Sequence, residues 1–83
     1  MITREVQVKL EDHQLTAAMI TSFVQHATSF SSSIQIGKNT KMIDGKSVLG
    51  VLTLGIKSGD HIILEADGHD EEQAIDKLST FFA

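Results

Sequence analysis

Four histidines are the residues of this sequence that could most readily carry reversible chemistry. A neutral imidazole is a nucleophile near physiological pH and also a common metal ligand. His26, His61 and His69 have no metal-like spacing with one another or with carboxylates, so we expect surface histidines and no metal site. His13 differs, because it stands three residues before a predicted helix start, in "HQLTAAMI" (residues 13–20). We therefore keep His13 as a candidate nucleophile.

No other set of side chains predicts an enzyme. The chain has no cysteine, so a thiolate nucleophile and a disulfide framework are both excluded. It carries no glycine-rich phosphate loop and no Ser/His/Asp set with a credible nucleophile. The acidic run "DGHDEE" (67–72) lacks the ligand spacing of a calcium loop and is typical of a turn and a helix cap.

Length and charge restrict the class of partner. The 83 residues predict one small domain, and the formal charge of −4 disfavours nucleic acid, which requires a basic surface. No stretch approaches the roughly 18 consecutive apolar residues of a membrane span, and the amino-terminal residues alternate instead of forming a signal peptide. We expect a cytoplasmic protein with protein partners and no cofactor.

Hydrophobic periodicity predicts the elements that position these residues. Alternation predicts strands over 2–10 and 61–67 and a hairpin over 33–44 that turns near 37–39. Thr16 and Ser47 are predicted to cap two helices, the second short and ended by Gly55. The last helix follows Asp70, which has a variant capping-box spacing with Gln73. The stretch 11–14 is predicted to be a polar loop.

The predicted order is β-α-β-β-α-β-α. Such alternation favours an α+β fold in which one antiparallel sheet is covered on one face by helices.

Two blocks of the sequence resemble the HPr family, the small phosphocarrier proteins of the bacterial sugar phosphotransferase system. They are "FVQHATSFSSSIQI" (23–36) and "GKSVLGVLTLGIKSGDHIILEADGHDEEQAIDKL" (45–78). The resemblance spans nearly the whole chain and implies one HPr-like domain over 1–83. Its implied fold is an open-faced sandwich of four antiparallel strands with three helices on one face.

The resemblance also implies that the family's carrier site has been replaced. HPr proteins carry a His-x-Arg-Pro pattern at the start of the first helix, where the histidine takes a phosphoryl group from enzyme I and passes it to enzyme IIA. Here Leu15 matches the preceding apolar residue, Thr16 the histidine, Ala18 the arginine and Met19 the proline. A threonine hydroxyl cannot serve as a reversible high-energy carrier. His13 lies nearby, but Glu11 and Asp12 would repel an incoming phosphoryl group.

A second family site is retained. The resemblance implies that Ser47 is the regulatory serine, which an ATP-dependent HPr kinase/phosphorylase modifies in Gram-positive bacteria. It further implies that Lys46, Val48, Leu49 and Leu52 belong to the surface that binds partners. The alternative is that Ser47 is only a helix cap and that the aliphatic residues after it belong to the core.

Loss of the histidine with retention of the serine is similar to the catabolite-repression HPr-like proteins (Crh). These act, when phosphorylated, as corepressors of a LacI-type catabolite control regulator. The sequence departs from Crh too, because it lacks the arginine and proline that Crh proteins generally keep. Three functions follow: a regulatory, non-catalytic protein modified at Ser47, a phosphocarrier that uses His13, and a scaffold that is never phosphorylated.

Overall fold

Alternating side chains in four strands build one antiparallel sheet. The computed structural model describes residues 1–83. The strands are β1 (Ile2–Gln7), β2 (Ser33–Lys38), β3 (Lys41–Asp44) and β4 (His61–Asp67), arranged in the order β1-β4-β2-β3. All neighbouring pairs are antiparallel. The tight turn between β2 and β3 places Asn39 at a φ of 60°, a left-handed conformation that asparagine tolerates.

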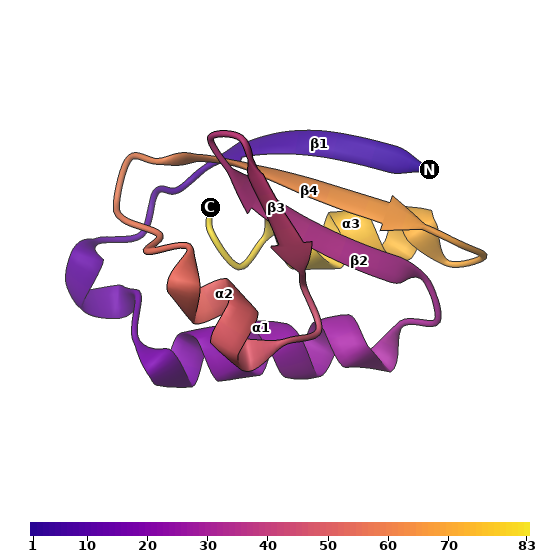
Figure 1. Ribbon diagram of the computed structural model, residues 1–83, viewed down its shortest axis with the longest axis horizontal. Coiled ribbons are helices and arrows are strands. Elements are labelled where there is room, and N and C mark those ends of the chain that lie inside the picture. Colours follow the sequence, from indigo (N-terminus) through magenta and orange to yellow (C-terminus); the bar gives the residue numbers. More distant parts are fainter.

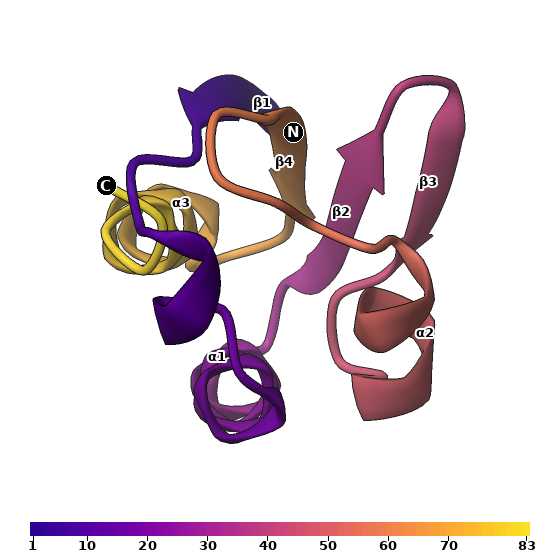
Figure 2. The same ribbon diagram turned by 90° about the vertical axis from the view of Figure 1, so that its left-hand side faces the viewer.

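Three helices cover one face of this sheet and leave the other bare. They are α1 (Ala17–Ser29), α2 (Val48–Thr53) and α3 (Glu71–Ser79), and Figures 1 and 2 show them on the same side of the strands. Because successive strand residues point to opposite faces, every second residue of a strand points to the helices, and these positions are mostly apolar. The α+β open-faced sandwich predicted from the sequence is confirmed.

The core lies between the sheet and the helices. Phe23 of α1 is fully buried, and its ring packs against Phe82 and Phe81 at centroid distances of 5.4 and 5.7 Å. The sheet contributes five buried side chains to the core, each at most 2% exposed: Ile34, Ile36, Ile62, Leu64 and Ala66. Burial of apolar area at about 25 cal/mol per Å² is the main force that holds a chain of this size without disulfides.

The first strand is shorter than predicted. β1 ends at Gln7 instead of continuing to Leu10, because the Lys9 amide donates to the Phe82 carbonyl at 2.7 Å and draws the chain towards the carboxyl-terminal end of α3. Val8 remains buried and pairs with the turn before β4, where its amide donates to Asp60 O at 2.8 Å. The alternation thus identified buried residues correctly but not the end of the strand.

The predicted polar loop 11–14 contains a short 3-10 turn, η1 (Asp12–Gln14). The Gln14 amide donates to the Glu11 carbonyl at 2.9 Å, and the Glu11 amide donates to Gln14 Oε1 at 2.9 Å. Asp12 Oδ1 accepts from the Ser58 amide at 2.8 Å, which ties this turn to the loop before β4. The segment is therefore fixed at both ends.

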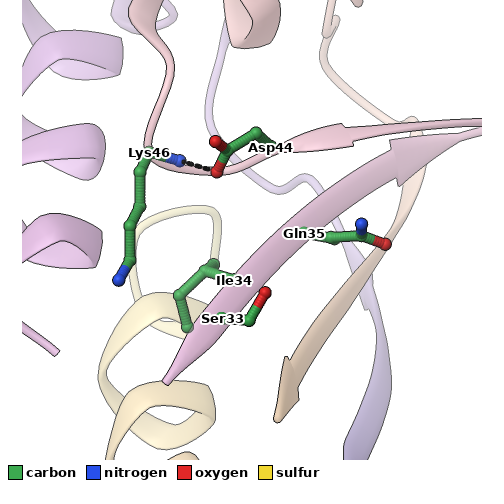
Figure 3. Close-up of a pocket in the computed structure, with 5 residues that line it drawn as sticks. All are labelled: Ser33, Ile34, Gln35, Asp44 and Lys46. Carbon is green, nitrogen blue, oxygen red and sulfur yellow. Dashed lines mark hydrogen bonds between the residues drawn. The ribbon is translucent and has the colours of Figure 1, made fainter. Parts of the chain in front are cut away.

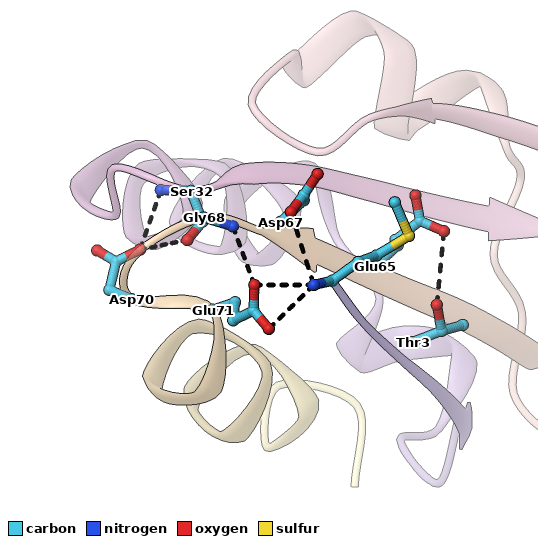
Figure 4. A network of polar contacts seen from close by, with 8 residues as sticks. Thr3, Ser32, Glu65, Asp67, Gly68, Asp70 and Glu71 are labelled. Carbon is cyan, nitrogen blue, oxygen red and sulfur yellow. Dashed lines mark hydrogen bonds and ion pairs between the residues drawn. The ribbon is translucent and has the colours of Figure 1, made fainter.

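The predicted capping box of α3 is wrong, because Asp70 is used elsewhere. Its side chain accepts no bond within α3. It accepts instead from the amides of Ser31 and Ser32, both at 2.9 Å, and from the Ser32 hydroxyl at 2.5 Å. Figure 4 shows this carboxylate against Ser32. The pKa of Asp70 is lowered to about 2, chiefly by the Ser32 hydroxyl and the Ser31 amide.

Acid is expected to weaken this tie between α3 and the start of β2. The pKa of Asp70 is about 2 in the folded chain, against 3.8 for an unperturbed aspartate. A carboxylate whose pKa falls on folding stabilises the fold above its unfolded pKa, and this stability is lost as the pH falls through the folded value. We therefore expect Asp70→Asn to be less stable than wild type at neutral pH and the difference to shrink between about pH 4 and pH 2.

Urea unfolding at several pH values measures this difference directly. Glu72→Gln, an exposed neighbour on α3, is the matched control and should leave the pH dependence unchanged. A gap between wild type and Asp70→Asn that stays constant down to pH 2 would contradict the assignment.

Candidate functional site

The start of α1 is an intact helix end whose N-cap is a threonine. Thr16 is its N-cap, and its Oγ1 accepts from the Met19 amide at 3.1 Å. The next two residues, Ala17 and Ala18, are exposed and offer only methyl groups. The single arginine of the chain, Arg4, belongs to β1 and pairs with Asp76 of α3 at 3.1 Å. No guanidinium is therefore available at this end to hold a phosphoryl group.

His13 is exposed and belongs to η1. Its imidazole makes no hydrogen bond, while the residues on both sides are held by the contacts of Asp12 and Gln14. His13 thus belongs to a turn that hydrogen bonds fix on both sides, ahead of the start of α1. Its role as a carrier remains an untested hypothesis that the local geometry does not favour.

Ser47 begins α2 as predicted. Its Oγ accepts from the Gly50 amide at 3.1 Å, and its own amide donates to the Asp44 carbonyl at 3.2 Å. Ser47 is half-buried and stands at the first turn of the helix. The ammonium group of the preceding Lys46 donates a hydrogen bond to the Phe30 carbonyl at 2.9 Å. This bond anchors the turn before α2 to the end of α1.

The apolar residues of α2 divide between the core and the surface. Val51 and Leu54 are 1% and 8% exposed and point inward, whereas Leu49 and Leu52 are 77% and 42% exposed. Val48 is half-buried between them. We refer to Val48, Leu49 and Leu52 as the α2 patch. A helix this short cannot bury every face, so an exposed patch follows from the run "VLGVL".

A small apolar hollow of about 150 Å³ joins the start of α1 to α2. Its lining includes Leu15 just before Thr16, Leu52 of the α2 patch, and Ile56 beyond the helix. Leu15, the residue before Thr16, and Leu52 of the α2 patch therefore line the same hollow. Sequence reasoning missed Ile56 and the hollow, and the only available signal was an apolar residue directly after the helix-ending Gly55.

The loop after α2 is fixed by a charged contact. Lys38 Nζ lies 2.8 Å from Asp60 Oδ2 and also donates to the Gly55 carbonyl at 2.9 Å. The pKa of Asp60 is lowered, first by its hydrogen bond with Lys38. This contact joins the end of β2 to both ends of the loop and so holds the hollow in shape.

Two classes of site are not found. No group of three or more histidine, aspartate or glutamate side chains is placed to hold a metal ion. None of the helices has the length and apolar character that a membrane span requires.

Comparison with known proteins places this fold and site in a family. The family model described as "PTS HPr component phosphorylation site" matches residues 2–83. The chain therefore belongs to the HPr family of the phosphotransferase system. The resemblance drawn from the two sequence blocks is confirmed.

Two similar relatives are HPr-like proteins Crh. That of Halalkalibacterium halodurans is 40% identical over 81 residues, covering 98% of this chain and 95% of the relative. That of Bacillus subtilis is 33% identical over 81 residues, covering 98% and 94%. Phosphocarrier protein HPr of Cupriavidus necator is 34% identical over 85 residues, covering 100% and 92%.

Solved structures agree on the fold. The phosphocarrier protein HPr of Bacillus anthracis superposes with a TM-score of 0.92 at 33% identity, covering 99% of this chain and 96% of that one. The crystal structure of Bacillus subtilis Crh, described as a swapped dimer, gives a TM-score of 0.77 at 33% identity, covering 99% and 93%.

Proposed function

We propose that this chain is a regulatory HPr-like protein that has lost the carrier histidine and acts through phosphorylation of Ser47 and protein binding in carbon catabolite control. One observation supports the proposal most strongly. Ser47 is the N-cap of α2, beside the exposed Leu49 and Leu52, whereas the N-cap of α1, where HPr proteins carry their histidine, is Thr16. Its relatives include proteins named Crh as well as HPr.

A phosphate on Ser47 has a favourable environment. The Gly50 amide already points at Ser47 Oγ, and the positive end of the α2 dipole adds to this attraction. A phosphoserine carries a charge of about −1.5 to −2 at neutral pH and three acceptor oxygens. The modification would therefore change the charge of the surface next to the α2 patch without requiring the fold to change.

The partners that this proposal implies are proteins. An HPr kinase/phosphorylase would modify Ser47, and a LacI-type catabolite control regulator would bind the modified surface through Lys46 and the α2 patch. Enzyme I and enzyme IIA, the partners of a working carrier, would find no phosphoryl acceptor at Thr16. The protein itself would catalyse nothing and need no cofactor.

Incubation with ATP and an HPr kinase/phosphorylase is expected to add one phosphate, which peptide mass spectrometry should place on Ser47. Ser47→Ala should abolish the modification, because it removes the only acceptor hydroxyl at the start of α2. Ser58→Ala, an exposed serine in the loop before β4, is the matched control and should be modified like wild type. No modification, or modification elsewhere, would favour the unphosphorylated scaffold.

A further inference from the structure

The face of the sheet that bears no helix carries an unusual distribution of charge. Residues on this face alternate along each strand with residues that point to the core. The strand register pairs Glu5 with Ile63. It also pairs Gln35 with Asp44 on one side and with Glu65 on the other, so these three residues share the face. Asp67 follows Glu65 on the same face of β4. Every acidic residue of the four strands thus lies on the bare face: Glu5, Asp44, Glu65 and Asp67.

The basic residues of the strands lie on the opposite face. Arg4 contacts Asp76 and Ser79 of α3, and Lys38 contacts the loop after α2. Lys41 is the register partner of Lys38 and shares its face. The chain has eleven acidic and seven basic residues, so removing the four carboxylates of the bare face leaves seven of each. The formal charge of −4 is therefore concentrated on this one face.

Few of these carboxylates are neutralised within the chain. Glu5, Asp44 and Glu65 belong to none of the ion pairs, and only Asp67 approaches a cation, the amino-terminal nitrogen at 3.6 Å. Glu65 accepts only the Thr3 hydroxyl, at 3.5 Å, as Figure 4 shows. Native surfaces usually mix charges of both signs, so a face of one sign is suited to a partner of the opposite sign.

The centre of the face is apolar. Met42 is 38% exposed and lies across Gly37, where an added Cβ would collide with its Sδ. Ile63, the next register position beyond Gly37, is half-buried. Met42 and Ile63 therefore form a short apolar ridge with carboxylates beside it. A ridge of this kind within a charged rim is the usual anatomy of a protein-binding surface.

A polar hollow lies at the end of this face where β2 and β3 diverge. Its volume is about 300 Å³, and Figure 3 shows Ser33, Gln35 and Asp44 on its wall. Lys46 also lines it, but its ammonium is bound by the Phe30 carbonyl and forms no ion pair with Asp44. Asp44 Oδ1 accepts from the Lys46 amide at 2.9 Å, so the hollow offers Asp44 Oδ2, the Ser33 hydroxyl and the Gln35 amide, which suit the end of an inserted lysine or arginine side chain.

We infer that the bare face of the sheet, with Met42 and Ile63 at its centre and Glu5, Asp44 and Glu65 around them, binds a basic and partly apolar segment of a partner protein. Nucleic acid and anionic lipid are repelled by the same charge, and a second copy would bring two negative faces together. Met42, Ile63, Glu5 and Glu65 are on the side of the sheet opposite to the helices and away from the α2 patch, whereas the hollow reaches Lys46, next to Ser47.

The test is an NMR titration at about 150 mM salt, so that unspecific attraction is screened. The probe is a capped peptide of two Lys-Lys-Leu-Leu-Lys-Lys repeats, and the comparison peptide has serine in place of leucine. We expect saturable shifts of the β1, β3 and β4 amides around Glu5, Met42 and Ile63. The leucine peptide should bind more tightly than the serine peptide.

Two double variants with equal charge change decide the outcome. Glu5→Gln/Glu65→Gln should weaken binding of the leucine peptide about fivefold, since it removes two of the exposed carboxylates that attract the basic peptide. Glu72→Gln/Asp76→Asn, on exposed positions of α3, should retain the affinity. Equal weakening by both variants, shifts confined to α1 and α2, or self-association through the same amides without peptide would overturn the inference.

Discussion

Replacement of Phe23 by alanine is expected to lower the free energy of unfolding by about 3–5 kcal/mol. The ring is 0% exposed and is the contact through which α1 packs against Phe81 and Phe82. Its removal loses the transfer free energy of a buried aromatic ring and leaves a cavity that neighbouring helices cannot fully close. Domains of this size have a total stability of about 5–15 kcal/mol, so one substitution removes a large fraction of it.

Urea denaturation followed by circular dichroism measures this loss. Leu49→Ala is the matched control, since Leu49 is 77% exposed, and it should change stability by less than about 0.5 kcal/mol. Phe23→Leu keeps a measurable folded state if the alanine variant does not fold, and it should lie between wild type and alanine. A loss below about 1 kcal/mol for Phe23→Ala would contradict the central place of this ring in the core.

Restoring the family pattern at α1 is expected to create a phosphocarrier. The triple variant Thr16→His/Ala18→Arg/Met19→Pro places an imidazole at the N-cap and a guanidinium two residues on. Thr16 Oγ1 and the Met19 amide now bond each other, and the variant removes this acceptor and donor together, so neither is left unsatisfied. Proline is tolerated in the first turn of a helix.

Enzyme I with phosphoenolpyruvate should label this variant with acid-labile phosphate. Wild type should stay unlabelled under the same conditions, because only the variant holds an imidazole acceptor at the N-cap of α1. Thr16→His alone is the control and should be labelled more slowly, since it lacks the charge-assisted contact of an arginine. Labelling of wild type as fast as the triple variant would show that another residue carries phosphate.

The sequence predicted the architecture well because its signals were local. The alternation of Ile34 and Ile36 identified a half-buried strand, and Thr16 and Ser47 were identified as caps because an N-cap bond needs only the next turn. The exposure of Leu49 and Leu52 agrees with the surface that the family resemblance implied, and a six-residue helix has too little core to cover them.

Features that depend on distant residues could not be predicted. Asp70 had the right spacing for a cap but binds Ser31 and Ser32, which are nearly forty positions away. The end of β1 is set by Phe82, and the bare face becomes visible only when Glu5, Asp44 and Glu65 are aligned by strand register. Such contacts are decided by tertiary structure, which overrides local preference.

The central proposal is that this chain has lost the phosphoryl carrier at the start of α1 and is phosphorylated on Ser47 alone. Parallel incubations, one with ATP and HPr kinase/phosphorylase and one with phosphoenolpyruvate and enzyme I, followed by acid treatment and mass spectrometry, test it most directly. The account predicts one acid-stable phosphate on Ser47 from the first and no phosphate from the second. Acid-labile phosphate from the second incubation that disappears in His13→Ala would contradict it.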